Sequence, residues 1–263
     1  MNNSHQPIGI FDSGIGGTSI WKEIHQLLPN ESTIYLSDSK NAPYGQKTPS
    51  EILNLSIKNT EYLIAKGAKI IVVACNTATT NAIQHLRNNY NIPFIGIEPA
   101  IKPASLNTKT SKIGILATKG TLNSALFEKT SSTLNSEITI IEQVGEGLVE
   151  LIEEGKIHSE EMTNLLEKYI SPMLEKGCDY IVLGCTHYPY LQPQIQKIAG
   201  KNVQIIDSGE AVARQLKNVM SEHNLLNNSK TQSSNIFYIN KEKSVLENIL
   251  KDYKNAKTEF LDF

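Results

Sequence analysis

Two cysteines occupy matching places in the two halves of the chain. Cys75 follows the apolar run at residues 70–74, and Cys185 follows a similar run at residues 180–184, so the thiols lie 110 positions apart. Each run is continuously apolar and contains β-branched residues. We therefore expect two buried parallel strands, each with its thiol at the carboxyl end, where open α/β sheets bind ligands. Two thiols placed alike indicate one chemical task carried out from two sides.

The residues after each thiol predict how it is activated. An Asn-Thr pair (76–77) follows Cys75, and a Thr-His pair (186–187) follows Cys185. Asn and Thr are good N-cap residues, so each cysteine should lie at a helix start, whose positive end lowers the pKa of a thiol toward neutrality. The alternative, that both cysteines are small buried hydrophobes, is disfavoured by their matching positions.

Three kinds of chemistry can use two thiols. A zinc site needs closely spaced Cys or His ligands, and none of the six histidines forms such a motif. A catalytic disulfide would have Cys-x-x-Cys spacing, which is missing, and Cys178 precedes its strand and is predicted to be structural. Proton transfer at opposite faces of one carbon fits the duplication best, which predicts two-base racemisation or epimerisation without a metal.

Two loops near the amino end supply further polar groups. The segment 11–17, Phe-Asp-Ser-Gly-Ile-Gly-Gly, follows a strand and precedes a helix, the context in which backbone N–H groups bind anions. It is not a dinucleotide fingerprint, because Ser19 stands where the third glycine belongs. Asp12 and Ser13 are candidates to receive an ammonium group or orient a thiol. Asp38 leads into Pro43-Tyr44-Gly45, whose N–H groups and tyrosine hydroxyl should lie near the same cleft.

Strand-like and helix-like segments alternate along the chain, which predicts βαβ units and an α/β fold with mainly parallel sheets flanked by helices. We expect strands at residues 8–11, 33–36, 70–74, 94–97, 113–117, 138–141, 180–184, 203–206 and 236–239. Helices are expected at residues 20–28, 49–66, 77–89, 160–176, 209–222 and 242–253.

The halves resemble diverged copies. Ile8-Gly9-Ile10 matches Ile113-Gly114-Ile115 at an offset of 105, and Ile97-Glu98 matches Ile206-Asp207 at an offset of 109. This predicts two similar, pseudo-symmetric domains with the active site in the cleft between them. Residues 1–97 with 207–263 would form the domain of Cys75, and residues 98–206 that of Cys185. The polar segments 98–112 and 224–234 are predicted to be connections.

Composition limits the class of ligand. The net charge of −2 and the pI of about 6.3 give no reason to expect nucleic acid or an anionic membrane as a partner. Arg87 and Arg214 are the only arginines, so we expect an anionic substrate to be held by N–H groups, hydroxyls and amides. The amino end has no secretory apolar region and no run is long enough to span a membrane, which predicts a cytoplasmic protein with free thiols.

Four motifs together resemble the glutamate racemases, the cofactor-independent bacterial enzymes that make D-glutamate for peptidoglycan. They are Phe-Asp-Ser-Gly-x-Gly-Gly at 11–17, Asp38 with Pro-Tyr-Gly at 43–45, Ala-Cys-Asn-Thr-Ala at 74–78 and Gly-Cys-Thr-His-Tyr-Pro at 184–189. The resemblance implies that Cys75 serves D-glutamate and Cys185 serves L-glutamate as acid/base thiols. It implies these substrate-binding residues: Asp12, Ser13, Tyr44, Gly45, Asn76, Thr77, Thr186 and His187.

The same resemblance implies supporting groups for each thiol. Asp12 would assist Cys75, and His187 with a glutamate would assist Cys185; spacing to Gly155 favours Glu153, with Glu150 as the alternative. Thr18 and Ser19 replace a leucine-containing continuation that is common in such enzymes. The resemblance further implies glutamate as the small-molecule substrate, no cofactor, and a homodimer.

Three other functions stay open on sequence alone. The first is a racemase for aspartate or another acidic amino acid, since the superfamily shares the paired thiols. The second is a non-catalytic two-domain binder of an amino acid, which would normally carry a signal peptide. The third is a hydrolase that uses Cys185 and His187, which leaves Cys75 without a role.

Overall fold

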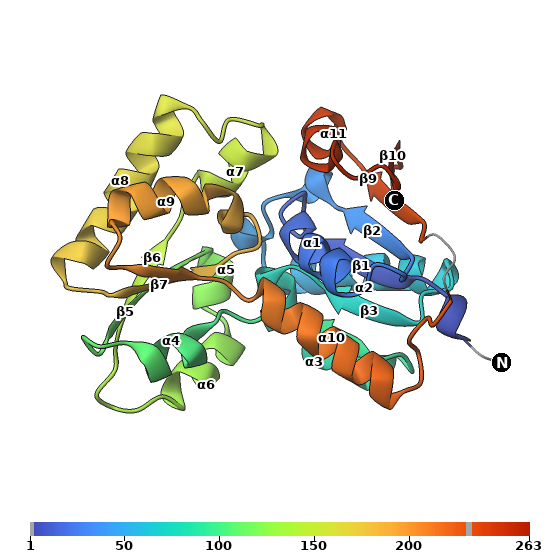
Figure 1. The fold of residues 1–263 in the computed structure, drawn as a ribbon, viewed down its shortest axis with the longest axis horizontal. Coiled ribbons are helices and arrows are strands. Elements are labelled where there is room, and N and C mark those ends of the chain that lie inside the picture. The colour runs from blue at the N-terminus through green and yellow to red at the C-terminus, as the bar shows by residue number, and fades with distance from the viewer. Residues whose placement is uncertain (1–2, 230–232) are drawn as a thin grey trace.

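The computed structural model describes residues 3–229 and 233–263, so parts of the amino-terminal segment and of the predicted linker at 224–234 lie outside it. The described residues form a six-stranded and a four-stranded sheet, which Figure 1 shows in two neighbouring lobes. Every strand pairing is parallel, and helices flank both sheets. The predicted α/β class with parallel sheets is confirmed.

The strands are β1 (Ile8–Asp12), β2 (Thr33–Ser37), β3 (Ile70–Val73), β4 (Phe94–Gly96), β5 (Lys112–Ala117), β6 (Thr139–Val144), β7 (Tyr180–Gly184), β8 (Gln204–Ile206), β9 (Asn235–Ile239) and β10 (Ala256–Phe260). The α-helices are α1 (Thr18–Leu27), α2 (Pro49–Ala65), α3 (Asn76–Asn89), α4 (Ile101–Asn107), α5 (Lys119–Leu122), α6 (Ala125–Ser132), α7 (Leu148–Glu153), α8 (Glu160–Glu175), α9 (Gln192–Ala199), α10 (Gly209–Glu222) and α11 (Ser244–Leu250). Short 3₁₀ helices are η1 (Asn3–His5), η2 (Ser39–Asn41), η3 (Tyr44–Gln46) and η4 (Tyr188–Leu191).

The two sheets repeat one strand order. The order β2-β1-β3-β4 in the larger sheet corresponds to β6-β5-β7-β8 in the smaller one. The registers correspond too, because Gly9 pairs with Ile71 and Gly114 pairs with Ile181. As a result β3 and β7, the strands before the two cysteines, occupy equivalent positions.

The carboxyl-terminal segment adds two strands to the larger sheet. β9 pairs with β2, and β10 pairs with β9 at the edge. The sequence reading missed β10 and made α11 too long. Lys257 and Glu259 interrupt the apolar pattern of β10, as is usual for an exposed edge strand.

Alternate strand residues face opposite layers of helices. In the larger sheet, Ile8 and Ile10 join the apolar cluster that includes α1 and α10, whereas Phe11 joins the cluster that includes α2 and α3. In the smaller sheet, Ile181 packs with α8 and α9, and Val182 packs with α4 and α6. Burial on both faces explains why the strands are continuously apolar in sequence.

The chain crosses between the sheets at residues 97–100 and 207–208. The crossings touch, because the Ser208 hydroxyl donates a hydrogen bond to the Glu98 carbonyl. The segment 98–112 is more than a connection, since it contains α4. The division into residues 1–97 with 207–263 and residues 98–206 stays a prediction. Across the described residues, no helix has the length and apolar character needed to cross a membrane.

Candidate active site

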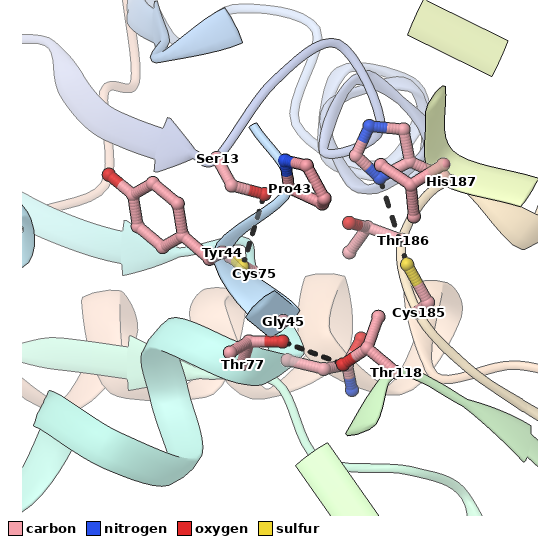
Figure 2. Close-up of a pocket in the computed structure, with 12 residues that line it drawn as sticks. Ser13, Pro43, Tyr44, Gly45, Cys75, Thr77, Thr118, Cys185, Thr186 and His187 are labelled. Atoms are coloured by element: carbon pink, nitrogen blue, oxygen red, sulfur yellow. Dashed lines mark hydrogen bonds between the residues drawn. The ribbon is translucent and has the colours of Figure 1, made fainter. Parts of the chain in front are cut away.

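Cys75 lies between β3 and α3 as the N-cap residue of that helix. Its sulfur accepts a hydrogen bond from the Ala78 N–H (3.4 Å), and its thiol donates to Ser13 Oγ (3.5 Å). The predicted helix start is therefore present on this side. Figure 2 shows the contact between Cys75 and Ser13.

The pKa of Cys75 contradicts the sequence expectation. Burial raises the pKa of the thiol well above its usual value, and the nearby charge of Asp12 raises it further. The hydrogen bonds from Ala78 and to Ser13 act in the opposite direction but are outweighed. A helix start alone does not decide the charge of a thiol that is shut away from water. These effects together favour the neutral thiol of Cys75.

Asp12 is fully buried at the end of β1. Its Oδ2 accepts the N–H groups of Gly14 (3.2 Å) and Gly17 (2.9 Å), and its Oδ1 accepts the Thr186 hydroxyl (3.3 Å). Burial raises the pKa of this carboxyl to about 6, against the lowering effects of the His187 charge and the Gly17 N–H. Asp12 thus titrates in a range where it can be charged or neutral.

Cys185 has different local surroundings from those predicted. Residues 186–187 form a turn that leads into the 3₁₀ helix η4, so no α-helix begins directly after this thiol. The Cys185 sulfur lies 3.7 Å from Nδ1 of His187. These neighbours in sequence therefore also meet in space, as Figure 2 shows.

His187 and Glu153 form a buried pair behind Cys185. Nε2 of His187 lies 2.6 Å from Glu153 Oε1, and the carboxylate also accepts the Ile15 N–H (2.7 Å) and the Ser39 hydroxyl (2.7 Å). Burial opposes the charge on both groups. For His187, contacts with Cys185 and Glu153 outweigh burial and raise its pKa well above the usual value. For Glu153, contacts with His187 and hydrogen bonds from Ser39 and Ile15 outweigh burial and lower its pKa. These shifts favour an imidazolium paired with a carboxylate.

Glu150, the alternative supporting glutamate, lies elsewhere. Its carboxylate accepts an exposed hydrogen bond from the Gln46 amide (2.7 Å). Both glutamates belong to α7, where they are one turn apart and face different surroundings. The geometry therefore associates Glu153, and not Glu150, with His187.

The glycine-rich loop serves the protein's own side chains. A Cβ on Gly14 would come within 1.9 Å of a Glu153 oxygen, and one on Gly16 within 2.2 Å of the His187 ring. Loop N–H groups at residues 14, 15 and 17 are already bonded to Asp12 or Glu153. The glycines are thus needed for close approach of these groups, and the predicted role in holding an external anion is wrong for those three N–H groups.

The Pro-Tyr-Gly loop differs from its predicted arrangement in one detail. The Tyr44 hydroxyl donates to Asp38 Oδ2 (2.5 Å) and accepts from the Asn59 amide (3.2 Å), so it does not face the cleft. Figure 2 shows it directed away from Cys185. The buried Asp38 also accepts the Asn240 amide (2.6 Å). Tyr44 and Gly45 are among the residues that line the cavity.

A small cavity brings the two thiols together. Figure 2 shows Cys75 and Cys185 on opposite sides of it. The lining residues are Ser13, Pro43, Tyr44, Gly45, Cys75, Asn76, Thr77, Thr118, Val149, Cys185, Thr186 and His187. Asp12 and Glu153 lie behind this lining. Cys178 and both arginines lie elsewhere.

Polar groups of the cavity include one without a partner. Both Oδ1 and Nδ2 of Asn76 are buried and make no hydrogen bond within the described protein. Thr77 Oγ1, by contrast, lies 2.8 Å from Thr118 Oγ1. Thr118 and Ser39 were missed from the sequence because each meets its partner only through long-range folding. An unpartnered buried amide is a group available to a ligand.

Within residues 3–229 and 233–263, no group of three or more His, Cys, Asp or Glu side chains is arranged to hold a metal ion. The cavity instead combines two thiols with hydroxyl, amide and N–H groups. Such a site can move protons at a bound small molecule.

A family model described as Asp/Glu/hydantoin racemase matches residues 8–216, which include both cysteines, the glycine-rich loop and Glu153. The chain belongs to this family. The resemblance drawn from the four sequence motifs is therefore confirmed at the level of the family.

Individual members of the racemase family match over most of the chain. A glutamate racemase of Ectopseudomonas mendocina is 46% identical over 235 residues, which cover 89% of each chain. The crystal structure of the Francisella tularensis glutamate racemase in complex with D-glutamate has a TM-score of 0.83 at 30% identity, covering 97% of this chain and 98% of that one. That of the Escherichia coli glutamate racemase with L-glutamate and the activator UDP-MurNAc-Ala has a TM-score of 0.85 at 32% identity, with the same coverage.

Proposed function

We propose that the protein interconverts L-glutamate and D-glutamate by two-base proton transfer between Cα and the thiols of Cys75 and Cys185. The observation that carries the proposal is the placement of two buried thiols on opposite sides of one cavity, each at the end of an equivalent strand. Membership in the racemase family and the similarity to enzymes crystallised with each glutamate enantiomer support it.

The proton transfer balances with the two thiols alone. From L-glutamate, the Cys185 thiolate takes the α-proton and the Cys75 thiol gives its proton to the opposite face, which leaves D-glutamate, a Cys185 thiol and a Cys75 thiolate. The reverse reaction uses the reverse protonation states. The raised pKa of Cys75 favours the neutral donor form, and the imidazolium of His187 is the charge that a thiolate at Cys185 needs. The proposal therefore includes no cofactor.

Binding groups must hold the substrate and stabilise the carbanion-like transition state. The unpartnered Asn76 amide, the Thr77 and Thr186 hydroxyls and the N–H groups at the start of α3 are donors for the carboxylates. The Asp12 carboxylate, which is hydrogen-bonded to Thr186 of the cavity lining, supplies a negative charge that favours the ammonium group. Fixed donors in a closed site stabilise developing charge more than water does.

The proposal extends to the role of the protein in the cell. D-glutamate made in the cytoplasm would supply peptidoglycan synthesis. The chain would act as a homodimer, with no nucleic acid or membrane as partner. Light scattering coupled to size-exclusion chromatography tests the dimer, and a mass of one chain would contradict it.

The direct test uses purified protein without added cofactor. L-glutamate should lose its circular dichroism as the enantiomers equilibrate, and in D₂O the D-glutamate formed should carry deuterium at Cα. L-aspartate, assayed in parallel, should react far more slowly. Faster turnover of aspartate would identify an aspartate racemase, and binding of glutamate without any change of its optical signal would contradict a catalytic role.

A further inference from the structure

We infer that Thr18 and Ser19, in the first turn of α1, hold Cys185 in position. Cys75, by contrast, is held by the start of α3. The inference rests on the proposed function, in which Cys185 is a catalytic thiol. The hydroxyls of Thr18 and Ser19 bond to Ile15, Tyr190 and Thr186 and not to a thiol, so both are positioning residues.

The turn that carries Cys185 has few local supports. The Cys185 carbonyl accepts the Tyr188 N–H (3.1 Å), and the His187 carbonyl accepts the Tyr190 N–H (3.2 Å). These are the bonds of a short 3₁₀ helix, a conformation with poorer hydrogen-bond geometry than an α-helix. The turn therefore gains from contacts with other parts of the chain.

Ser19 supplies one such contact. Its hydroxyl donates a hydrogen bond to the Thr186 carbonyl (2.8 Å). That carbonyl belongs to the peptide group that joins Thr186 to His187, one residue after Cys185. Fixing this peptide fixes the direction from which the His187 ring approaches the sulfur.

Thr18 supplies the second contact and connects the Cys185 turn to Glu153. Its hydroxyl has one proton, which it donates to the Ile15 carbonyl (2.5 Å), so it accepts the proton of the Tyr190 hydroxyl at 2.6 Å. The N–H of the same Ile15 donates to Glu153. A continuous set of hydrogen bonds thus runs from the Cys185 turn, through α1, to the carboxylate that pairs with His187.

Lys22 extends the same face of α1. It lies four residues after Thr18, and its Nζ is 5.0 Å from the centre of the Tyr190 ring. Residues four apart share one face of a helix. The start of α1 thus contacts both ends of the turn that follows Cys185.

The test uses Ser19→Ala and Thr18→Val, which remove the hydroxyls, with Ser19→Thr and Thr18→Ser as variants that keep them. Ser131→Ala is the matched control, because it removes a hydroxyl that donates a hydrogen bond to the Phe127 carbonyl within α6. Tyr190→Phe removes the donor from the other side of the Thr18 contact. Circular dichroism and thermal unfolding identify variants that fold.

Site-resolved alkylation shows which thiol is affected. With iodoacetamide and peptide mass spectrometry, Ser19→Ala and Thr18→Val should label Cys185 at least about threefold faster than wild type while Cys75 is unchanged, since each removes one hydrogen bond from the turn. Racemisation should fall about three- to tenfold. The hydroxyl-keeping variants and Ser131→Ala should match wild type.

Steady-state kinetics alone cannot show whether a variant impairs Cys185 or Cys75. The equilibrium constant between enantiomers is one, so kcat/KM must change equally for L- and D-glutamate. Equal acceleration of labelling at both thiols, or unchanged labelling and rate, would overturn the inference. Failure of wild type to racemise any amino acid would instead overturn the proposed function, and Cys185 labelling would still report on the contact.

Discussion

Cys75 and Cys185 reach one cavity by different local construction. Cys75 caps a 14-residue helix, and its sulfur is bonded within its own sheet-to-helix connection. Cys185 is followed by a 3₁₀ turn and lies beside an imidazolium, whose partner Glu153 belongs to a separate helix. Equivalent strands therefore give equivalent positions, while the protonation of each thiol depends on its own neighbours.

The difference also concerns connections between the sheets. Behind Cys185, Glu153 accepts hydrogen bonds from Ile15 and Ser39, which both follow strands of the larger sheet. On the Cys75 side, the comparable connection is between the hydroxyls of Thr77 and Thr118. A charged network thus holds one side of the site, and neutral hydroxyls hold the other.

Replacing either cysteine should have the largest effect. Cys75→Ser and Cys185→Ser should each lower racemisation by about 10²–10⁴-fold, the usual contribution of one acid/base group. Each variant should retain slow exchange of the α-proton without inversion, for D-glutamate in Cys185→Ser and for L-glutamate in Cys75→Ser. Proton NMR in D₂O measures this exchange. Undiminished racemisation by either variant would refute the two-thiol mechanism.

The Glu153 pair tests whether the Cys185 side needs its charged support. Glu153→Gln should lower kcat about 10²-fold, because His187 loses the carboxylate that holds and charges its ring. Glu150→Gln is the control from the same helix and should be close to wild type. Steady-state kinetics and the NMR titration of His187 measure the two consequences. Equal effects of Glu153→Gln and Glu150→Gln would contradict a special role of the Glu153–His187 pair on the Cys185 side.

Asp12 tests the Cys75 side through pH. Its pKa is about 6, so kcat/KM should fall about tenfold per pH unit below that value as the carboxyl takes up a single proton. Asp12→Asn should be less active at pH 8 and should lack this acid limb. An acid limb that is unchanged in Asp12→Asn would assign it to another group.

The raised pKa of Asp12 predicts that the protein becomes less stable as pH rises, whereas its activity increases. The folded pKa of Asp12 lies above its unfolded value of 3.8, so its stabilising contribution is present below that pH and is lost as pH rises through about 6. Asp12→Asn should therefore unfold at a higher temperature than wild type at pH 8. Thermal unfolding at pH 5 and pH 8 measures the change.

The hydroxyl contact on the Cys75 side should give the smallest effect. Thr118→Val removes one neutral hydrogen-bond partner of Thr77, a change of about 0.5–1.5 kcal/mol, which corresponds to a KM about two- to tenfold higher. Thr118→Ser keeps the hydroxyl and should restore KM. A loss of kcat as large as that of Glu153→Gln would show that both sides depend equally on their supports.

The sequence predicted those features that depend on local pattern. Continuous apolar runs identified the strands before both cysteines, and the helical pattern at residues 49–66 identified α2. Short helices such as α5 and α7 were missed because a few turns carry little periodicity. The glycines at 14 and 16 were visible, but their purpose depends on Glu153 and His187, which are more than 130 residues away.

Protonation was the least predictable property of the site. A helix start after Cys75 indicated a lowered pKa, yet burial and Asp12 have the larger effect and raise it. The direction of the Tyr44 hydroxyl was also unpredictable, because it depends on Asp38 and Asn59 from two further segments. Desolvation and long-range contacts arise only when the cavity is assembled, so they cannot be predicted from a short sequence motif.

The buried amide of Asn76 couples ligand binding to stability, because no described protein group pairs with it. A buried polar group without a partner costs about 1–3 kcal/mol, and a ligand that pairs with it recovers that free energy. Glutamate should therefore raise the unfolding temperature of wild type more than that of Asn76→Leu. Part of the affinity for the ligand thus depends on a buried amide that no described protein group pairs with. A substitution that removes this amide would weaken substrate recognition.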